Sequence, residues 1–130
     1  MPISGLRISD VIASAKVGLK AFNTAALELH NVQVNADTGP AFLVQESKEL
    51  ELDGVSTRAP RSDTPVVRLD RCPGAIVRNC KAFPGTATFL STGPGELKSI
   101  VLEGNALGNA RKATEEAPGT EFLHEPPTEE

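Results

Sequence analysis

Five polar or charged residues recur at nearly constant spacing and could together carry out acid–base chemistry. Ser9, His30, Asp53, Arg78 and Glu103 are separated by 21, 23, 25 and 25 residues. Imidazole and carboxylate groups are common proton donors and acceptors in enzyme sites. Such chemistry requires segments that are distant in the sequence to lie side by side. The elements that carry these residues therefore have to be established first.

Each of the five residues lies in a short repeated phrase. The first and third positions of the phrase are apolar, an alternation typical of a half-buried β-strand. The phrases are LRISDV from Leu6, LELHNV from Leu27, LELDGV from Leu50, AIVRNC from Ala75 and IVLEGN from Ile100. We therefore expect five equivalent strands, one in each structural repeat.

The fifth position of each phrase is restricted to three residue types. It holds Asp10, Asn31, Gly54, Asn79 and Gly104. Asp, Asn and Gly are the residues that most readily adopt the left-handed backbone conformation. After this position the apolar alternation shifts by one residue and a second short strand begins. A single left-handed residue explains the shift, because it turns the chain while keeping apolar side chains inward.

A third strand follows a loop of variable length in each repeat. Its register predicts one inward column of Leu19, Phe42 and Val67, and a second of Ala21, Val44 and Leu69. Three short strands in each 21 to 25 residues predict an all-β fold, a parallel β-helix of about five coils over residues 1–110. An antiparallel sandwich also uses many short strands, but it gives no reason for a left-handed residue at a fixed phase.

The remaining residues, 111–130, differ in composition from the repeats. They hold two basic and six acidic side chains together with several prolines. This composition predicts an acidic tail, partly disordered or lying along the last coil.

The repeat resembles the right-handed parallel β-helix of the pectin lyase-like superfamily. Within it, the sequence is most similar to the carboxyl-terminal coils of glycoside hydrolase family 28, which includes the polygalacturonases. The resemblance covers roughly residues 3–110 and is carried by GLRISDV, ALELHNV, RCPGAIVRNC and IVLEGNAL. Members of that family use an Asn-x-Asp motif, an Asp-Asp pair, a Gly-His-Gly turn and an Arg-x-Lys motif, and the last three are absent from this sequence. The resemblance therefore implies a fold and an ancestry, and no catalytic residue is carried over.

The ladder itself offers Asp53 and Glu103 as candidate catalytic carboxylates. Neighbouring coils lie about 4.8 Å apart, which places these two residues roughly 9 to 10 Å apart. Inverting glycosidases separate their carboxylates by about 6.5 to 9.5 Å, so the spacing is barely permissive. Arg78 between them would keep both ionised, which disfavours a general acid. We favour an outward ion-pair ladder without enzymatic activity, with a glycan-hydrolysing β-helix as the alternative.

A basic cluster surrounds the longest loop and is a candidate binding site for an acidic polysaccharide. It consists of Arg58, Arg61, Arg68 and Arg71. The alternative is ordinary exposed charge balanced by Asp63 and Asp70. The chain has no Trp or Tyr, the side chains that carbohydrate-binding modules usually present to sugar faces.

Composition and short motifs limit the other classes of partner. Residues 1–110 hold eleven basic and eleven acidic side chains, which indicates neither a nucleic acid nor a membrane partner. The segment MPISGLRISD has no features of a signal peptide, although the resemblance implies a secreted or periplasmic parent. Two histidines nearly a hundred residues apart indicate no metal cluster, and no cofactor motif occurs. Cys72 and Cys80 are expected to be reduced and buried, with a bridge between them as the alternative.

The first coil begins at Ile3 without an amphipathic helix or polar cap before it. A solenoid end without a cap exposes apolar side chains and strand edges. We therefore expect either a homo-oligomer or the downstream part of a longer β-helix, truncated at its N-terminal end. The predicted function is a non-catalytic scaffold or assembly module. An adhesion or tailspike-like β-helix would show the same stacked coils.

Overall fold

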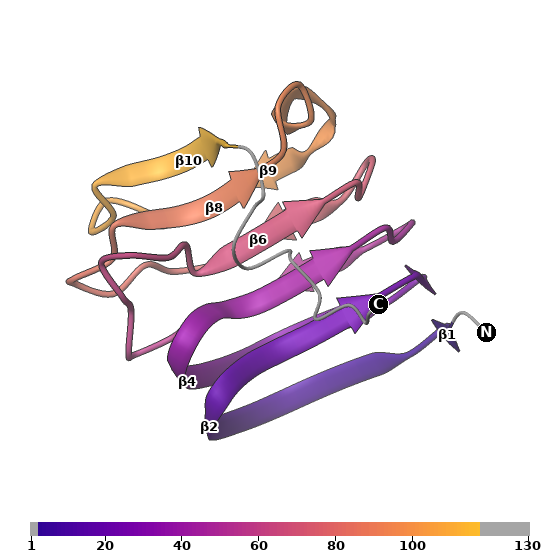
Figure 1. Ribbon diagram of the computed structural model, residues 1–130. Helices are drawn as coiled ribbons and strands as arrows, with labels where there is room; N and C mark the ends of the chain where they lie inside the picture. Colours follow the sequence, from indigo (N-terminus) through magenta and orange to yellow (C-terminus); the bar gives the residue numbers. More distant parts are fainter. Residues whose placement is uncertain (1–2, 118–130) are drawn as a thin grey trace, which may run out of the picture.

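The computed structural model describes residues 3–117 and forms an all-β parallel β-solenoid of about five coils (Figure 1). Its strands are β1 (Ile3–Ser4), β2 (Arg7–Phe22), β3 (Thr24–Ala25), β4 (Glu28–Gln45), β5 (Glu51–Asp53), β6 (Val67–Asp70), β7 (Ile76–Arg78), β8 (Thr88–Thr92), β9 (Val101–Glu103) and β10 (Lys112–Glu116). A short 3-10 helix, η1 (Leu97–Ser99), is the one helical element within the described part of the chain. None of the helical structure there has the length and apolar character needed to cross a membrane.

Every paired strand runs parallel to its neighbour, which excludes the antiparallel sandwich. One run of pairing joins β2, β4, β5, β7 and β9, and another joins β4, β6, β8 and β10. In the first two coils the strand passes around the corners without a break, so β2 and β4 each span most of a coil. The two strands are paired over most of their length, and β10 lies at the opposite end of the stack (Figure 1).

The core consists of apolar columns that run along the solenoid. One column stacks five residues of the repeated phrase: Ile8, Leu29, Leu52, Val77 and Leu102. Its three central members are fully buried. Removing each such side chain from water stabilises the fold by about 1.5 to 3 kcal/mol.

The third strand of each repeat supplies a second pair of columns. Pairing of β2 with β4 and of β4 with β6 confirms the predicted columns of Leu19, Phe42 and Val67 and of Ala21, Val44 and Leu69. In β8 the next members are Leu90 and Thr92. The first of these columns is therefore apolar through four coils, and the second is apolar through three and continues with Thr92.

The predicted left-handed corner is present in all five coils. The φ angles are +58° at Asp10, +56° at Asn31, +73° at Gly54, +55° at Asn79 and +61° at Gly104. Side chains also connect these corners, since the Asn31 amide donates a hydrogen bond to Asp10 Oδ1 at 2.9 Å. The residue type is thus selected by backbone conformation, and Asn adds a contact between coils.

Two further left-handed columns carry no clear residue-type pattern, and the sequence analysis missed them. One precedes the repeated phrase, and the other follows the third strand. The first contains Gly5, Ala26, Glu49 and Gly74, and the second contains Asn23, Glu46 and Arg71. A non-glycine residue in this conformation costs about 1 to 2 kcal/mol. Hydrogen bonds between coils offset that cost, as when Glu46 N donates to Asp70 O at 2.8 Å.

The sheet continues beyond residue 110, where the sequence suggested that the coils end. Strand β10 pairs in parallel with β8, and Lys112 N donates to Ala87 O at 2.8 Å. The first part of the predicted tail is therefore the outermost strand of one sheet face. The rest of that tail lies outside the described residues.

Both cysteines are free and buried. The Cys80 thiol lies against backbone carbonyls, with Sγ 3.3 Å from Arg78 O. Burial raises the pKa of the Cys72 and Cys80 thiols to about 11. The structure thus matches the expectation of core thiols and not the alternative of a bridge between them.

The positive φ angle at the corner leads to a prediction about the stability of variants at Gly54. A β-carbon added there would lie 3.5 Å from the backbone of Asn31, an ordinary contact, so only the φ angle restricts the residue type. We expect Gly54→Asn to change the free energy of unfolding by less than about 1 kcal/mol and Gly54→Val to lower it by about 2 kcal/mol. Urea unfolding of both variants measures this. Equal losses would contradict a conformational origin.

The thiols make a second prediction. Because the thiolate is the reactive species and its formation is suppressed, the native protein should react very slowly with a thiol reagent at pH 8. After denaturation without reductant, two thiols per chain should react at once. Absence of reactive thiols in the denatured protein would show that a bridge forms.

Candidate functional site

The polar ladder predicted from the sequence forms on the outward face of β2, β4, β5, β7 and β9. Strand pairing places Ser9 beside His30, His30 beside Asp53, Asp53 beside Arg78 and Arg78 beside Glu103. Side chains at alternate positions of a strand share a face, so the ladder lies opposite the apolar column of the core. The register was predictable because each repeat keeps the same phase.

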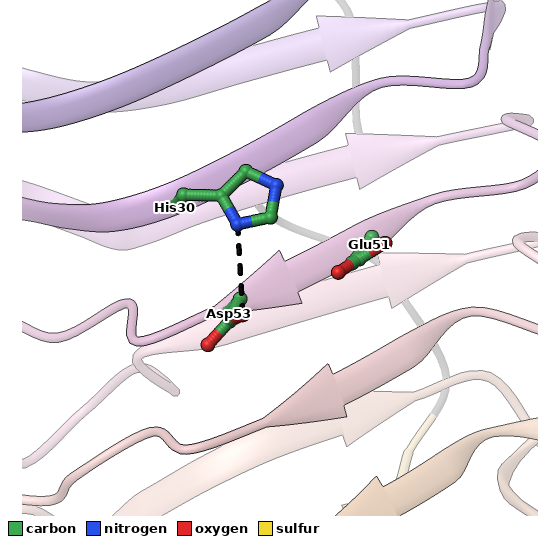
Figure 2. A group of neighbouring side chains, drawn as sticks. All are labelled: His30, Glu51 and Asp53. Carbon is green, nitrogen blue, oxygen red and sulfur yellow. Dashed lines mark ion pairs between the residues drawn. The ribbon is translucent and has the colours of Figure 1, made fainter.

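His30 lies at the centre of this face, between two carboxylates. Its Nε2 atom is 2.9 Å from Glu28 Oε1, and its Nδ1 atom is 3.5 Å from Asp53 Oδ2. Figure 2 shows the His30 ring above Asp53, with Glu51 on the same strand as Asp53. The four side chains are half-buried, so solvent still reaches them.

Arg78 contacts the same carboxylates from the next coil. Its guanidinium forms an ion pair with Glu51, and its Nε atom lies 3.4 Å from Asp53 Oδ2. Asn79 donates to the other Asp53 oxygen, Oδ1, at 3.1 Å. Asp53 thus accepts from two residues of the following coil while facing His30 of the preceding one.

These contacts favour the ionised forms of two carboxyl groups. The hydrogen bond from Asn79, together with Arg78 and His30, lowers the pKa of Asp53 below its ordinary value. The hydrogen bond with His30, together with Arg7, likewise lowers the pKa of Glu28. A general acid must hold its proton near neutral pH, so neither group is suited to that role.

Glu103 does not share Arg78 in the way the sequence suggested. Within residues 3–117, the ion pairs of Arg78 go to Glu51 and Asp53. The side chain of Glu103 is exposed at the end of the stack. Arg78 instead forms ion pairs with Glu51 and Asp53. Glu51 lies two residues before Asp53 on β5, so both side chains share one face of the strand. Glu51 and Glu28 belong to a neighbouring outward column of the repeat, which the spacing of the repeated phrases also predicts.

Among residues 3–117, stacking brings together one group of side chains that could hold a metal ion. Donor atoms of His30, Glu51 and Asp53 lie within 4.8 Å of one another. The sequence indicated no metal cluster because the two histidines are far apart. Stacking supplies carboxylates from another coil in place of a second histidine.

The four arginines proposed for polysaccharide binding do not form one exposed patch. Arg68 is fully buried and donates hydrogen bonds to Ser91 Oγ at 2.8 Å and to Thr92 O at 3.0 Å. Arg71 forms ion pairs with Glu46 and Asp70. A surface ligand cannot reach Arg68, so the cluster as predicted is wrong in that member.

The other two arginines lie near the longest loop and already have partners. The Arg58 guanidinium lies 4.4 Å from the centre of the Phe83 ring, and Arg61 Nε lies 3.3 Å from Asp63 Oδ1. A hollow lined by Arg61 and Pro60 has a volume of about 10 Å³, room for at most one water molecule. The loop therefore presents no cavity of sugar size at this hollow.

A short stretch near this loop has the Asn-x-Asp spacing of the hydrolase family. It is Asn35-Ala36-Asp37, and the Asn35 side-chain oxygen accepts a hydrogen bond from Arg58 N at 2.7 Å. The hydrogen bond to the Asn35 side chain thus connects the second coil to the third. No Asp-Asp pair accompanies it in the sequence, so the spacing adds no catalytic assignment.

The first coil is a second candidate surface. Its outward side chains Ile12 and Phe22 are 77% and 62% exposed. One coil further along, the positions paired with them hold Gln33 and Gln45. At these two positions the first coil is therefore apolar where the second coil is polar.

The fold and both surfaces can be set beside known proteins. Comparison with protein-family models, curated proteins and solved structures found no match to this chain.

The ladder geometry predicts the outcome of an activity assay. Because Asp53 is held ionised and Glu103 lies two coils away from it on the exposed strand β9, the purified chain should release no reducing ends from polygalacturonate between pH 4 and 8. Turnover that disappears in both Asp53→Asn and Glu103→Gln would contradict this and support the hydrolase alternative.

Proposed function

We propose that this chain is a non-catalytic scaffold module that assembles head to tail through the two ends of its coil stack. In this proposal it is similar to the carboxyl-terminal coils of pectin-degrading glycoside hydrolases. The observation that carries the proposal is that the column of the repeated phrase ends in an incompletely covered apolar side chain at both ends of the stack, while one third-strand column ends in opposite charges.

The apolar column of the repeated phrase ends at both ends of the stack with an incompletely covered side chain. Ile8 is half-buried, and Leu102 is 41% exposed. If a second copy stacks in the same register, its Ile8 lies against Leu102 of the first. The column then continues between copies as it does between coils, and both side chains leave water.

On the face formed by the third strand of each coil, one column of paired residues has oppositely charged side chains at its two ends. Pairing between successive strands makes one column of Lys20, Leu43, Arg68, Ser91 and Glu115. Its two ends carry opposite charges, so a second copy would place Lys20 beside Glu115. A partly exposed pair of this kind contributes up to about 1 kcal/mol.

The strand edges at the two ends are also complementary. Among the described residues, β2 pairs on one side only, as do β9 and β10 at the other end. Parallel strands can continue in the same direction only if the first coil of one copy meets the last coil of another. Such a contact joins two different surfaces and gives open-ended chains.

A charge exchange tests the assembly. We expect Lys20→Glu and Glu115→Lys each to weaken self-association about tenfold, since an attraction becomes a repulsion. The double variant should recover most of the loss. Sedimentation velocity over a range of micromolar concentrations measures each dissociation constant.

The matched control is Lys48→Glu, which makes the same charge change at an exposed position of the second coil. It should leave association unchanged. A strictly monomeric wild-type protein would refute the proposal, as would equal association in all the variants. A dimer that is lost with Ile12→Gln, and that does not respond to the charge exchange, would instead indicate pairing of two first coils.

A further inference from the structure

Both ring nitrogens of His30 face carboxylate oxygens. Nε2 lies 2.9 Å from Glu28 Oε1, and Nδ1 lies 3.5 Å from Asp53 Oδ2. An ionised carboxylate accepts hydrogen bonds and donates none. A neutral imidazole carries one N–H group. In either tautomer, one ring nitrogen therefore directs its lone pair toward a carboxylate.

A positive ion between that nitrogen and that carboxylate would remove the repulsion between the nitrogen lone pair and the carboxylate oxygen. The closer contact, Nε2 with Glu28, is typical of the hydrogen bond that orients a metal-bound histidine. This leaves Nδ1 and Asp53 Oδ2 as the pair facing an ion. Two ligand atoms of a tetrahedral Zn²⁺ lie about 3.4 Å apart, close to the 3.5 Å observed here.

Glu51 supplies a third donor from the same strand as Asp53. Its carboxylate is one of three groups whose donor atoms all lie within 4.8 Å of one another. Because all three side chains are half-buried, an ion can enter from solvent and a water molecule can complete its coordination. Imidazole with carboxylate oxygens is a ligand set that suits Zn²⁺.

The charge of the cluster permits a cation but also opposes it. Three carboxylates, those of Glu28, Glu51 and Asp53, meet two guanidinium groups, Arg7 and Arg78. The group is therefore negative by one charge when His30 is neutral. Arg78 competes with any metal ion, since it contacts both Glu51 and Asp53.

We propose that His30, Glu51 and Asp53 bind one Zn²⁺ ion on the outward face of β4 and β5. Glu28 positions the imidazole, and Arg78 limits the affinity by competing for the carboxylates. The ion would connect the second coil to the third and stabilise their stacking. This site departs from the sequence analysis, which indicated no metal cluster, and it is independent of the head-to-tail assembly.

Titration of the full chain with zinc chloride at pH 7.5 tests the proposal. Calorimetry measures the binding, and thermal unfolding with and without zinc measures the midpoint temperature. We expect one saturable site per chain and a raised midpoint. His30→Gln and Asp53→Asn should each weaken binding at least about tenfold. Arg78→Gln should tighten binding severalfold, because it removes the competing cation. That gain would not follow from a purely structural role of Arg78.

Two controls separate this site from other zinc ligands. His124→Gln removes the only other histidine and should leave binding unchanged. Magnesium chloride should give no saturable binding, because Mg²⁺ favours oxygen ligands. The proposal is refuted if zinc does not bind, if binding survives in His30→Gln, or if Arg78→Gln weakens it.

Discussion

The rest of the structure depends on parallel backbone pairing between successive coils in one fixed register. Strands in such a ladder lie about 4.8 Å apart, so each position of the repeat meets its counterpart in the next coil. Apolar positions then form continuous columns, such as the one in which Leu29, Leu52 and Val77 are fully buried. A shift of one residue would turn every one of these side chains outward. Register and core therefore reinforce each other.

The corners maintain that register. Each coil must turn within one residue and still return its apolar side chains to the interior, and a positive φ achieves this. Where the turn residue is Gly or Asn, the conformation costs little. At Ala26, Glu46 and Glu49 the same conformation is imposed on residues that disfavour it. The hydrogen bonds of neighbouring coils provide the compensation, so the strain in one coil depends on the presence of the next.

The same stacking creates the two surfaces to which functions are proposed. On the outward face it brings His30, Asp53 and Arg78 from three coils into contact, although 48 residues separate the first from the last. Within residues 3–117 the stacking stops at the two ends, where Ile8 and Leu102 each pair with a neighbour on one side only. Assembly would complete the columns, while an ion in the ladder would strengthen the stack from within. The two proposals rest on different atoms and can fail separately.

The sequence by itself determined the coil architecture, because alternation and the Asp, Asn or Gly corner are local properties that repeat at a visible period. It also determined which residues share a column, including the ladder from Ser9 to Glu103. It could not determine the corners at Ala26 and Glu49, where pairing between coils overrides residue preference, or the burial of Arg68, which depends on the elements packed around it.

Only the tertiary structure decided which rungs of the ladder touch. Arg78 selects Glu51 and Asp53 over Glu103, and His30 lies between Glu28 and Asp53. The reason is physical: a column fixes the neighbours of a backbone position, whereas the direction of a long side chain depends on every charge and hydrogen bond within its reach.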